Sequence, residues 1–399
     1  MDEVVVTGAG IVSPIALGVD AFWEALLSGR HGLTAIPDSA DLAGNGYWAG
    51  VPDAYLAQTN LPSDFLRNAD RFTQYAVIAA AQAFSMAGLE LPPAKTAVLI
   101  GNTMGGLPLL TETQMQLASN PRHITPKLMA LVIPNMAAAR ISMNWGLLGR
   151  QLTISTACAS SLDAIGLAAR MIEHGEVRCA IAGGVETLLA PVVYASLERA
   201  GALSRSRDPK RASCPFDVQR DGFVMGDGGA LLVLEAASHA HERGARVVAR
   251  VRGYASMADG HHLTAPEPSG RYEAQVMEAA IEDAGCTIEA IYAHATGTVV
   301  GDIAELRAIN AIFPERRIPV TSLRGHLGHA MAAAGVMSAI AGILGMKLDV
   351  IPHTLGTEHV EPEARFDLVL HEPRRLHYDA FLVNAFGFGG QNASLVLSQ

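Results

Sequence analysis

Cysteine and charge are both scarce in this sequence of 399 residues. It contains four cysteines, and none has the CxxC or CxxH spacing that is typical of a zinc site or a redox pair. We therefore expect no disulfide framework, no cysteine-ligated zinc and a reducing, cytoplasmic compartment. Charged residues make up 17% of the chain, and the net charge is −10 without a block of Lys and Arg. Nucleic-acid binding is therefore not expected.

Targeting and membrane-spanning segments are not evident either. The N-terminus MDEVVVTGAG has neither a basic segment nor a cleavage-site pattern, so we expect no signal peptide. The longest uncharged run, residues 330–346, is rich in Ala and Gly and falls just short of the ~20 residues that cross a bilayer. We expect a buried core helix there and no membrane association.

Apolar runs typical of β-strands alternate with helical stretches along the chain. Because strands and helices alternate, the sequence predicts an α/β fold whose sheet is covered by helices on both faces. The strand-like runs are residues 4–8, 97–101, 152–156, 179–184, 230–235, 248–253, 291–295, 318–322 and 381–386.

The order of these elements repeats. Residues 75–88 precede a strand in the way that residues 273–285 do, and residues 157–175 follow a strand in the way that residues 323–345 do. We infer two similar α/β halves, residues 1–250 and 251–399. Ligands of open α/β sheets gather at the carboxyl ends of the strands. Equivalent strand ends from the two halves are therefore expected to form one site, which would bring together Cys158, His294 and His329.

Cys158 stands between a strand and a helical run. A thiol at a helix N-terminus is favoured as thiolate by the helix dipole. A sharp strand-to-helix turn also leaves backbone N–H groups free to bind an oxyanion. The alternative is a small buried cysteine, which is the role expected for Cys179, Cys214 and Cys286.

Three histidines also lie at the ends of predicted strands or helices. His294 ends the strand at 291–295 and is followed by small residues that permit a ligand to approach, although a solvated turn is the alternative. His326 and His329 are three residues apart, but no HExxH or Glu-x-x-His pattern and no acidic ligand accompanies them. We therefore expect no metal site and a structural role for one of the pair.

Two glycine-rich segments are candidates for ligand binding. In VVVTGAGIVSP, Ser13 stands where a dinucleotide loop has its third glycine and Pro14 obstructs the following helix, so a dinucleotide site is not expected. The segment NAFGFGGQNAS, residues 384–394, lies between two apolar strands. It can bring backbone N–H groups close to a thioester, or it can be an ordinary hairpin.

In order along the chain, VVVTGAGIVSP, TACASS, FDVQRDGFVMGDGG, HATGTVVGD, GHAMAAAG and NAFGFGGQNAS resemble the elongating β-ketoacyl-ACP synthases. This family has the thiolase fold and includes bacterial fatty-acid synthases and type II polyketide ketosynthases. The resemblance implies duplicated α/β halves in a layered α-β-α-β-α architecture. It also implies decarboxylative condensation of malonyl-ACP with an acyl chain to give 3-oxoacyl-ACP. No metal or other cofactor is implied, because the phosphopantetheine arm of acyl carrier protein carries the substrates.

The resemblance assigns roles to individual residues. Cys158 would be the nucleophile, and His294 and His329 would assist decarboxylation. The backbone N–H groups of Cys158 and Phe388 would form the oxyanion hole, with the Phe388 ring as gate. Thr264, Thr296 and Thr298 would bind pantetheine, Leu110 and Leu197 would line the acyl pocket, and His326 would be a bystander.

Three departures from the family pattern stand out. Arg324 replaces the usual lysine, and we expect an ion pair between Arg324 and Glu305. Ala295 replaces a customary glycine, which restricts the backbone beside His294. The expected docking surface for the acidic carrier protein is sparsely basic, and its candidates are Arg67, Arg71, Arg205, Arg207, Lys210 and Arg211.

Two further readings of the same fold stay open. A non-catalytic subunit similar to a chain-length factor typically lacks the nucleophile. The second alternative is a ketosynthase-like acyltransferase. A degradative thiolase is not expected, because it would carry a second cysteine in the C-terminal glycine loop. The partner of this chain would be a second copy of itself or a chain-length-factor-like paralogue.

Overall fold

A computed structural model describes residues 2–36, 46–59, 61–89, 92–120, 122, 124–315 and 317–399. Its largest sheet has the strand order β13-β11-β10-β15-β16-β9-β1-β8-β6-β4-β5. The first half contributes β1 (Val4–Val12), β4 (Ala97–Gly101), β5 (Gln151–Ile154), β6 (Cys179–Glu186) and β8 (Gly228–Ala236). The second half contributes β9 (Ala249–Ala258), β10 (Ala290–Tyr292), β11 (Pro319–Thr321), β13 (Asp367–Leu368), β15 (Ala380–Gly387) and β16 (Gln391–Ser398).

The same pattern of strand pairing occurs twice in this sheet. In the first half, β5, β4 and β6 are parallel, and β8 and β1 follow antiparallel. In the second half, β11, β10 and β15 are parallel, and β16 and β9 follow antiparallel. The halves join where three residues of β1 pair with three of β9. The predicted duplication is therefore confirmed, whereas the division at residue 250 stays a prediction.

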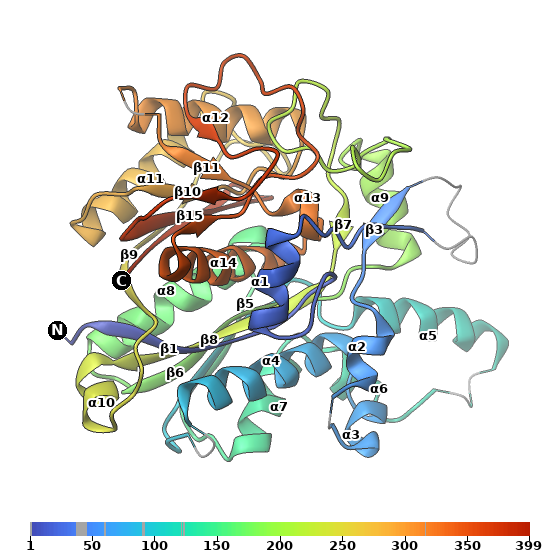
Figure 1. Cartoon of the computed structure of the whole chain (residues 1–399). Coiled ribbons are helices and arrows are strands. Elements are labelled where there is room, and N and C mark those ends of the chain that lie inside the picture. The colour runs from blue at the N-terminus through green and yellow to red at the C-terminus, as the bar shows by residue number, and fades with distance from the viewer. Residues whose placement is uncertain are drawn as a thin grey trace.

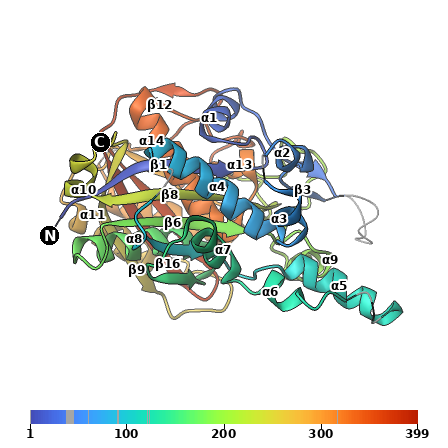
Figure 2. The same cartoon turned by 90° about the horizontal axis from the view of Figure 1, so that it is seen from below.

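The helices form three layers that alternate with the two halves of the sheet (Figure 1). The middle layer is α8 (Ser160–Glu173) and α14 (Ala334–Leu348). One outer layer is α4 (Arg71–Ala87) and α7 (Met136–Trp145), seen from below in Figure 2, and the other is α11 (Arg271–Ala284) and α12 (Val299–Ile312). Each layer has its own cluster of buried apolar side chains against the sheet. This is the layered α-β-α-β-α architecture predicted from the resemblance.

Shorter elements connect these layers. The helices are α1 (Val19–Leu27), α2 (Asp53–Ala57), α3 (Ser63–Arg67), α5 (Leu107–Ser119), α6 (Leu128–Val132), α9 (Pro191–Arg199), α10 (Ala237–Glu242) and α13 (Arg324–Leu327). Two single 3₁₀ turns, η3 (Ala157–Ala159) and η4 (Met331–Ala333), precede α8 and α14. The small strands are β2 (Thr34–Ala35), β3 (Tyr47–Ala49), β7 (Met225–Gly226), β12 (Val350–Ile351) and β14 (Arg374–Arg375).

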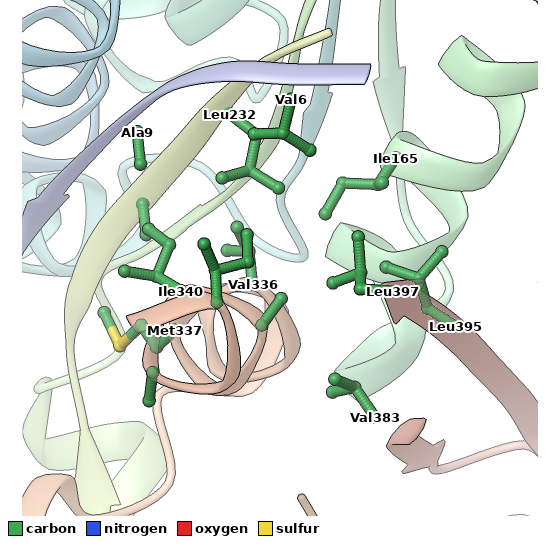
Figure 3. Close-up of a cluster of buried hydrophobic side chains, with 14 of the residues drawn as sticks. Val6, Ala9, Ile165, Leu232, Val336, Met337, Ile340, Val383, Leu395 and Leu397 are labelled. Carbon is green, nitrogen blue, oxygen red and sulfur yellow. The ribbon is translucent and has the colours of Figure 1, made fainter. Parts of the chain in front are cut away.

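The middle layer is the centre of the core. Figure 3 shows Val336 and Ile340 of α14 pointing toward side chains of β1 and β8, among them Val6 and Leu232. Among the described residues, one helical window, Met331–Leu348, is long and apolar enough to cross a membrane, but 83% of it is buried inside the protein. This segment is the core helix that the sequence predicts.

The glycines of VVVTGAG serve packing rather than ligand binding. A Cβ atom at Gly8 or Gly10 would come within 2.1 or 2.0 Å of carbonyl oxygens of α4. Only glycine therefore permits α4 to lie this close to β1, which is the reason for the motif that resembles a dinucleotide loop.

Candidate active site

Two equivalent strand-to-helix turns meet at the centre of the molecule. Ala157, the first residue of η3, has φ 48°, and Met331, the first residue of η4, has φ 42°. Left-handed backbone at residues other than glycine is strained and tends to occur at functional sites. The Cys158 Sγ lies 3.9 Å from the Met331 sulfur. The two halves thus bring corresponding turns face to face.

Cys158, His294 and His329 meet beside these turns. Cys158 Sγ is 3.0 Å from His329 Nε2, and one ligand atom from each of the three residues lies within 4.8 Å of the others. The two imidazole rings are 5.2 Å apart, edge to face. All three residues are buried. The geometric prediction that joined residues from both halves is confirmed, while their catalytic roles stay predictions.

Glu305 of α12 holds the loop that carries His294. Its carboxylate accepts the backbone N–H groups of His294 (2.9 Å) and Ala295 (2.7 Å), and the amide of Asn384 (3.0 Å). The predicted ion pair between Glu305 and Arg324 is wrong as a direct contact, because these amide donors already occupy the carboxylate. Arg324 is 1% exposed, yet none of its guanidinium nitrogens has a hydrogen-bond partner.

The buried Arg324 cation acts on the site through space. Burial lowers the pKa of the Arg324 guanidinium to about 10, so it remains charged at neutral pH. Burial, followed by the Arg324 charge, holds the pKa of His294 well below its ordinary value. Burial, His294 and Arg324 together do the same to the pKa of His329. Both imidazoles are therefore neutral at pH 7.

The Cys158 thiol is protonated at rest. Burial raises its pKa to about 12, while Arg324 and the backbone N–H groups of Phe388 and Cys158 oppose this rise. The thiolate that the helix N-terminus predicts is therefore not the resting form, because desolvation outweighs the charge and hydrogen bonds that favour it.

The glycine-rich turn between β15 and β16 closes over Cys158. A Cβ atom at Gly387 would lie 2.9 Å from the backbone nitrogen of Cys158, so glycine permits this close approach. The next residue, Phe388, directs its backbone N–H toward the sulfur and leaves its ring 40% exposed. Two N–H groups thus face the atom at which a thioester would form.

A cavity of about 450 Å³ opens from this turn. Predicted residues that line it are Cys158, Leu197, Thr264, His294, Thr296, Thr298, His329 and Phe388. Leu110, predicted for the acyl pocket, is not part of this lining and is 40% exposed on α5. That prediction is wrong for this chain taken alone, because α5 extends away from the body of the protein (Figure 1).

One wall of the cavity is acidic and has no signal in the sequence. Asp259, Glu273 and Asn392 line it and are buried. Burial raises the pKa of Glu273 to about 7, and neither of its carboxyl oxygens has a hydrogen-bond partner. From sequence, Glu273 is an ordinary acidic residue in the first turn of a helix, where acidic side chains are common.

Two of the predicted docking residues are partly buried and make contacts within the protein. Arg71 donates to the Tyr75 hydroxyl (2.9 Å) and the Val51 carbonyl (2.7 Å), and Arg211 forms an ion pair with Asp217 at 3.0 Å. These contacts hold both guanidinium groups against the protein, and the role of Arg71 and Arg211 in docking stays a prediction. The exposed cations are Arg67, Arg205, Arg207 and Lys210, and Lys127 lies beside Asn68 on the same surface as Arg67.

The Cys158, His294 and His329 group is compact enough for one metal ion. Two features disfavour that use. A buried, unpaired guanidinium lies close enough to affect all three residues. The Nδ1 atoms of both histidines also lack a partner, whereas metal-bound histidines usually donate the second ring N–H to an acceptor.

Comparison with known proteins agrees with this arrangement. The family model "Beta-ketoacyl synthase, N-terminal domain" matches residues 1–240, and its C-terminal counterpart matches residues 248–358. The 3-oxoacyl-[acyl-carrier-protein] synthase 2 of Vibrio cholerae is 37% identical, with 100% of this chain and 99% of that protein covered.

Solved structures have the same fold. A β-ketoacyl synthase from Burkholderia phymatum superposes with a TM-score of 0.92 at 32% identity over all of both chains. A type II polyketide ketosynthase in complex with its acyl-carrier protein gives a TM-score of 0.90 at 28% identity, with 100% and 99% of the chains covered. With both family models, a full-length relative and these folds in agreement, this chain belongs to the β-ketoacyl synthase family and is an acyltransferase of the thiolase-like fold.

Proposed function

We propose that this chain is a β-ketoacyl-ACP synthase that condenses malonyl-ACP with an acyl chain held on Cys158, in fatty-acid or type II polyketide biosynthesis. The observation that carries the assignment is the 3.0 Å contact between Cys158 Sγ and His329 Nε2, inside a cavity that His294 also lines. An inert partner subunit has no need for a nucleophile in contact with a histidine. The catalytic reading is therefore favoured over the chain-length-factor reading.

In the loading step, Cys158 sulfur attacks the thioester carbonyl of acyl-ACP. A new C–S bond forms, the C–S bond to the phosphopantetheine arm breaks, and the carrier-protein thiol leaves with the proton that Cys158 gives up. The neutral His329 imidazole is within reach of that proton. The N–H groups of Cys158 and Phe388 would stabilise the oxyanion of the tetrahedral intermediate.

In the condensation step, neutral imidazoles can donate Nε2–H to the thioester oxygen of malonyl-ACP. The bond to the carboxylate carbon breaks, carbon dioxide leaves, and the electron pair remains as an enolate that these N–H groups stabilise. The enolate carbon then attacks the acyl-Cys158 carbonyl, and the Cys158 sulfur departs. Burial and Arg324 keep the imidazoles neutral, which this hydrogen-bonding role requires.

The substrates would be delivered on an acyl carrier protein. The hydroxyls of Thr296 and Thr298, 3.2 Å apart, and Thr264 line the cavity and suit the amide groups of a pantetheine arm. The exposed cations Arg67, Lys127, Arg205, Arg207 and Lys210 would attract an acidic carrier. These steps require no metal or organic cofactor, and we infer a cytoplasmic location from the four free thiols.

The edge strand β5 suggests a second subunit. It ends the sheet, and its residues Gln151 and Leu152 are exposed. The helix α5, which extends to one side in Figures 1 and 2, adds the exposed apolar side chains Leu110 and Met115. Uncovered edge strands and exposed apolar side chains are both usually covered by a partner. We infer a dimer through β5, with a second copy or a paralogue.

The first prediction concerns loading. Cys158→Ala should abolish the mass increase that acyl-ACP produces on the intact protein, because no other thiol lines the cavity among the described residues. Intact-protein mass spectrometry measures this. Cys214→Ala, a buried thiol outside the cavity, is the matched control and should load like the wild type. Condensation by the Cys158→Ala variant would contradict the assignment.

The second prediction concerns decarboxylation. His329→Ala should lower the rate of carbon dioxide release from malonyl-ACP by about 10²-fold or more, because a donor to the developing enolate is lost. Release of labelled carbon dioxide measures it. His239 lies on α10 and contacts Glu235, so His239→Ala is the control and should leave the rate of carbon dioxide release unchanged. A His329→Ala variant with wild-type decarboxylation would exclude this histidine from the reaction.

The third prediction concerns pH. Arg324 lowers the pKa of Cys158, His294 and His329, so Arg324→Met should raise all three. Loading needs the thiol deprotonated and decarboxylation needs the imidazoles neutral, so both limits move to higher pH. Iodoacetamide alkylation and carbon dioxide release across pH measure these limits. Arg324→Lys retains the charge and is the control, and an unchanged profile in Arg324→Met would rule out the through-space effect.

The fourth prediction concerns assembly. The purified 41.9 kDa chain should elute as a dimer in size exclusion with light scattering, and Leu152→Asp should shift it toward monomer because a charge is placed at the edge strand. The exposed Val247→Asp, remote from β5 in the sequence, is the control. A monomeric wild type would contradict the homodimer, and mixing with a co-purified paralogue would then test the heterodimer.

A further inference from the structure

The ring of His326 is wedged between two backbone carbonyl groups. His326 lies on the four-residue helix α13 and is fully buried. Its Nδ1 is 2.9 Å from the carbonyl oxygen of Arg30, and its Nε2 is 2.9 Å from that of His353. Its own carbonyl accepts the N–H of Gly32 at 2.8 Å. Through its ring and its backbone carbonyl, this one residue contacts both the turn after α1 and the loop after β12.

The helix α13 carries Arg324 at one end and leads to His329 at the other. The Arg324 guanidinium has no hydrogen-bond partner, so its place depends on packing and on the backbone of α13. That backbone is held at the Arg324 carbonyl by the Ser213 hydroxyl (2.9 Å) and at His326 by the contacts above. A change at His326 would therefore move the charge that acts on Cys158, His294 and His329.

The two acceptors impose a condition on the His326 ring. A neutral imidazole has one N–H, whereas both partners of this ring are carbonyl oxygens that can only accept. Burial lowers the pKa of His326 to about 4, against the opposing effect of the two carbonyl groups. At neutral pH one contact is therefore a hydrogen bond, and the other sets a ring lone pair against a carbonyl oxygen.

We propose that His326 is a positioning residue for the condensation reaction. Its imidazole fixes α13 between the Arg30 and His353 carbonyls, and so sets where Arg324 and His329 stand relative to Cys158. This inference rests on the proposed function of those three residues. It also replaces the expectation that His326 is a bystander, since its ring and its backbone carbonyl together contact segments of the first and second halves.

Neighbouring histidines complete the setting of this ring. The His353 ring packs edge to face on His326 at 5.5 Å, and its Nδ1 is buried without a partner. His353 and His31 both act against a positive charge on His326. The surroundings therefore keep the His326 ring neutral. The single N–H of the neutral ring donates a hydrogen bond to one of the two carbonyl oxygens.

Three substitutions separate shape from hydrogen bonding. His326→Met fills the site without a donor, His326→Asn places an amide near the position of Nδ1, and His326→Gln places it near the position of Nε2. Two readouts are measured in each: kcat and KM for carbon dioxide release from malonyl-ACP, and the pH midpoint of Cys158 alkylation. The midpoint reports the distance of the Arg324 charge and requires no turnover.

We expect His326→Met to lower kcat about tenfold or more with KM little changed, as small misplacements of catalytic groups do, and to raise the alkylation midpoint. One amide variant, Asn or Gln, should restore both values, and it identifies the ring nitrogen that bears the proton. His353→Gln, which retains the carbonyl, is the control and should match the wild type.

Other results would overturn the inference. It fails if folded His326→Met keeps the wild-type kcat and midpoint, or loses only thermal stability. Should His326→Met not fold, equal values for the Asn and Gln variants would overturn it. A wild type that releases no carbon dioxide would instead contradict the proposed function, and the alkylation midpoints alone would then decide the role of His326.

Discussion

The site depends on one structural constraint: two strained turns from duplicated halves are packed against each other. Each turn begins with a residue other than glycine at positive φ and leads into a helix of the middle layer. The first turn carries Cys158, and the second begins two residues after His329. Because the turns are in contact, Cys158 of one half lies 3.0 Å from His329 of the other. The buried helices α8 and α14 make that contact rigid, since their side chains fill the central core.

A second constraint is the buried charge of Arg324. An unpaired cation in the interior is costly unless other groups offset it. Here the carboxylates of Glu305 and Asp302 supply favourable electrostatic interactions without direct contact, and a Cys158 thiolate would add to them. Glu305 cannot approach further because it holds the His294 loop through three amide donors. The arginine thus favours neutral imidazoles and a deprotonated sulfur, both of which the proposed chemistry needs.

The strands could be predicted from the sequence because apolar runs and helical periodicity are local properties, whereas their order in the sheet depends on long-range pairing. Boundaries were less predictable. The strand β10 ends at Tyr292, shorter than the predicted run to residue 295, because the N–H groups of His294 and Ala295 donate to Glu305 instead of a neighbouring strand. The strand β1 extends to Val12, four residues beyond the predicted run, because its glycines lie under α4.

Within the site, the residues that the motifs carry were predictable, and those that depend on side-chain direction were not. The triad follows from strand ends that converge. Three assignments required knowledge of which hydrogen bonds or surfaces compete for a side chain. They are the ion pair between Glu305 and Arg324, the docking roles of Arg71 and Arg211, and the placement of Leu110 in the acyl pocket. The acidic wall of Asp259 and Glu273 lacks a sequence signal because the two residues come from different elements.

The pair His326 and His329 shows what spacing alone leaves open. Three residues apart, they could share one face of a helix, but α13 ends at Leu327 and Gly328 follows with φ 63°. The break turns His329 toward Cys158, where its backbone is held by a bridge to Met225, and leaves His326 directed into the protein between two carbonyls. One glycine therefore separates two chemically identical side chains into different environments. In the proposed arrangement, His326 does not line the cavity but fixes the segment that leads to His329, which does.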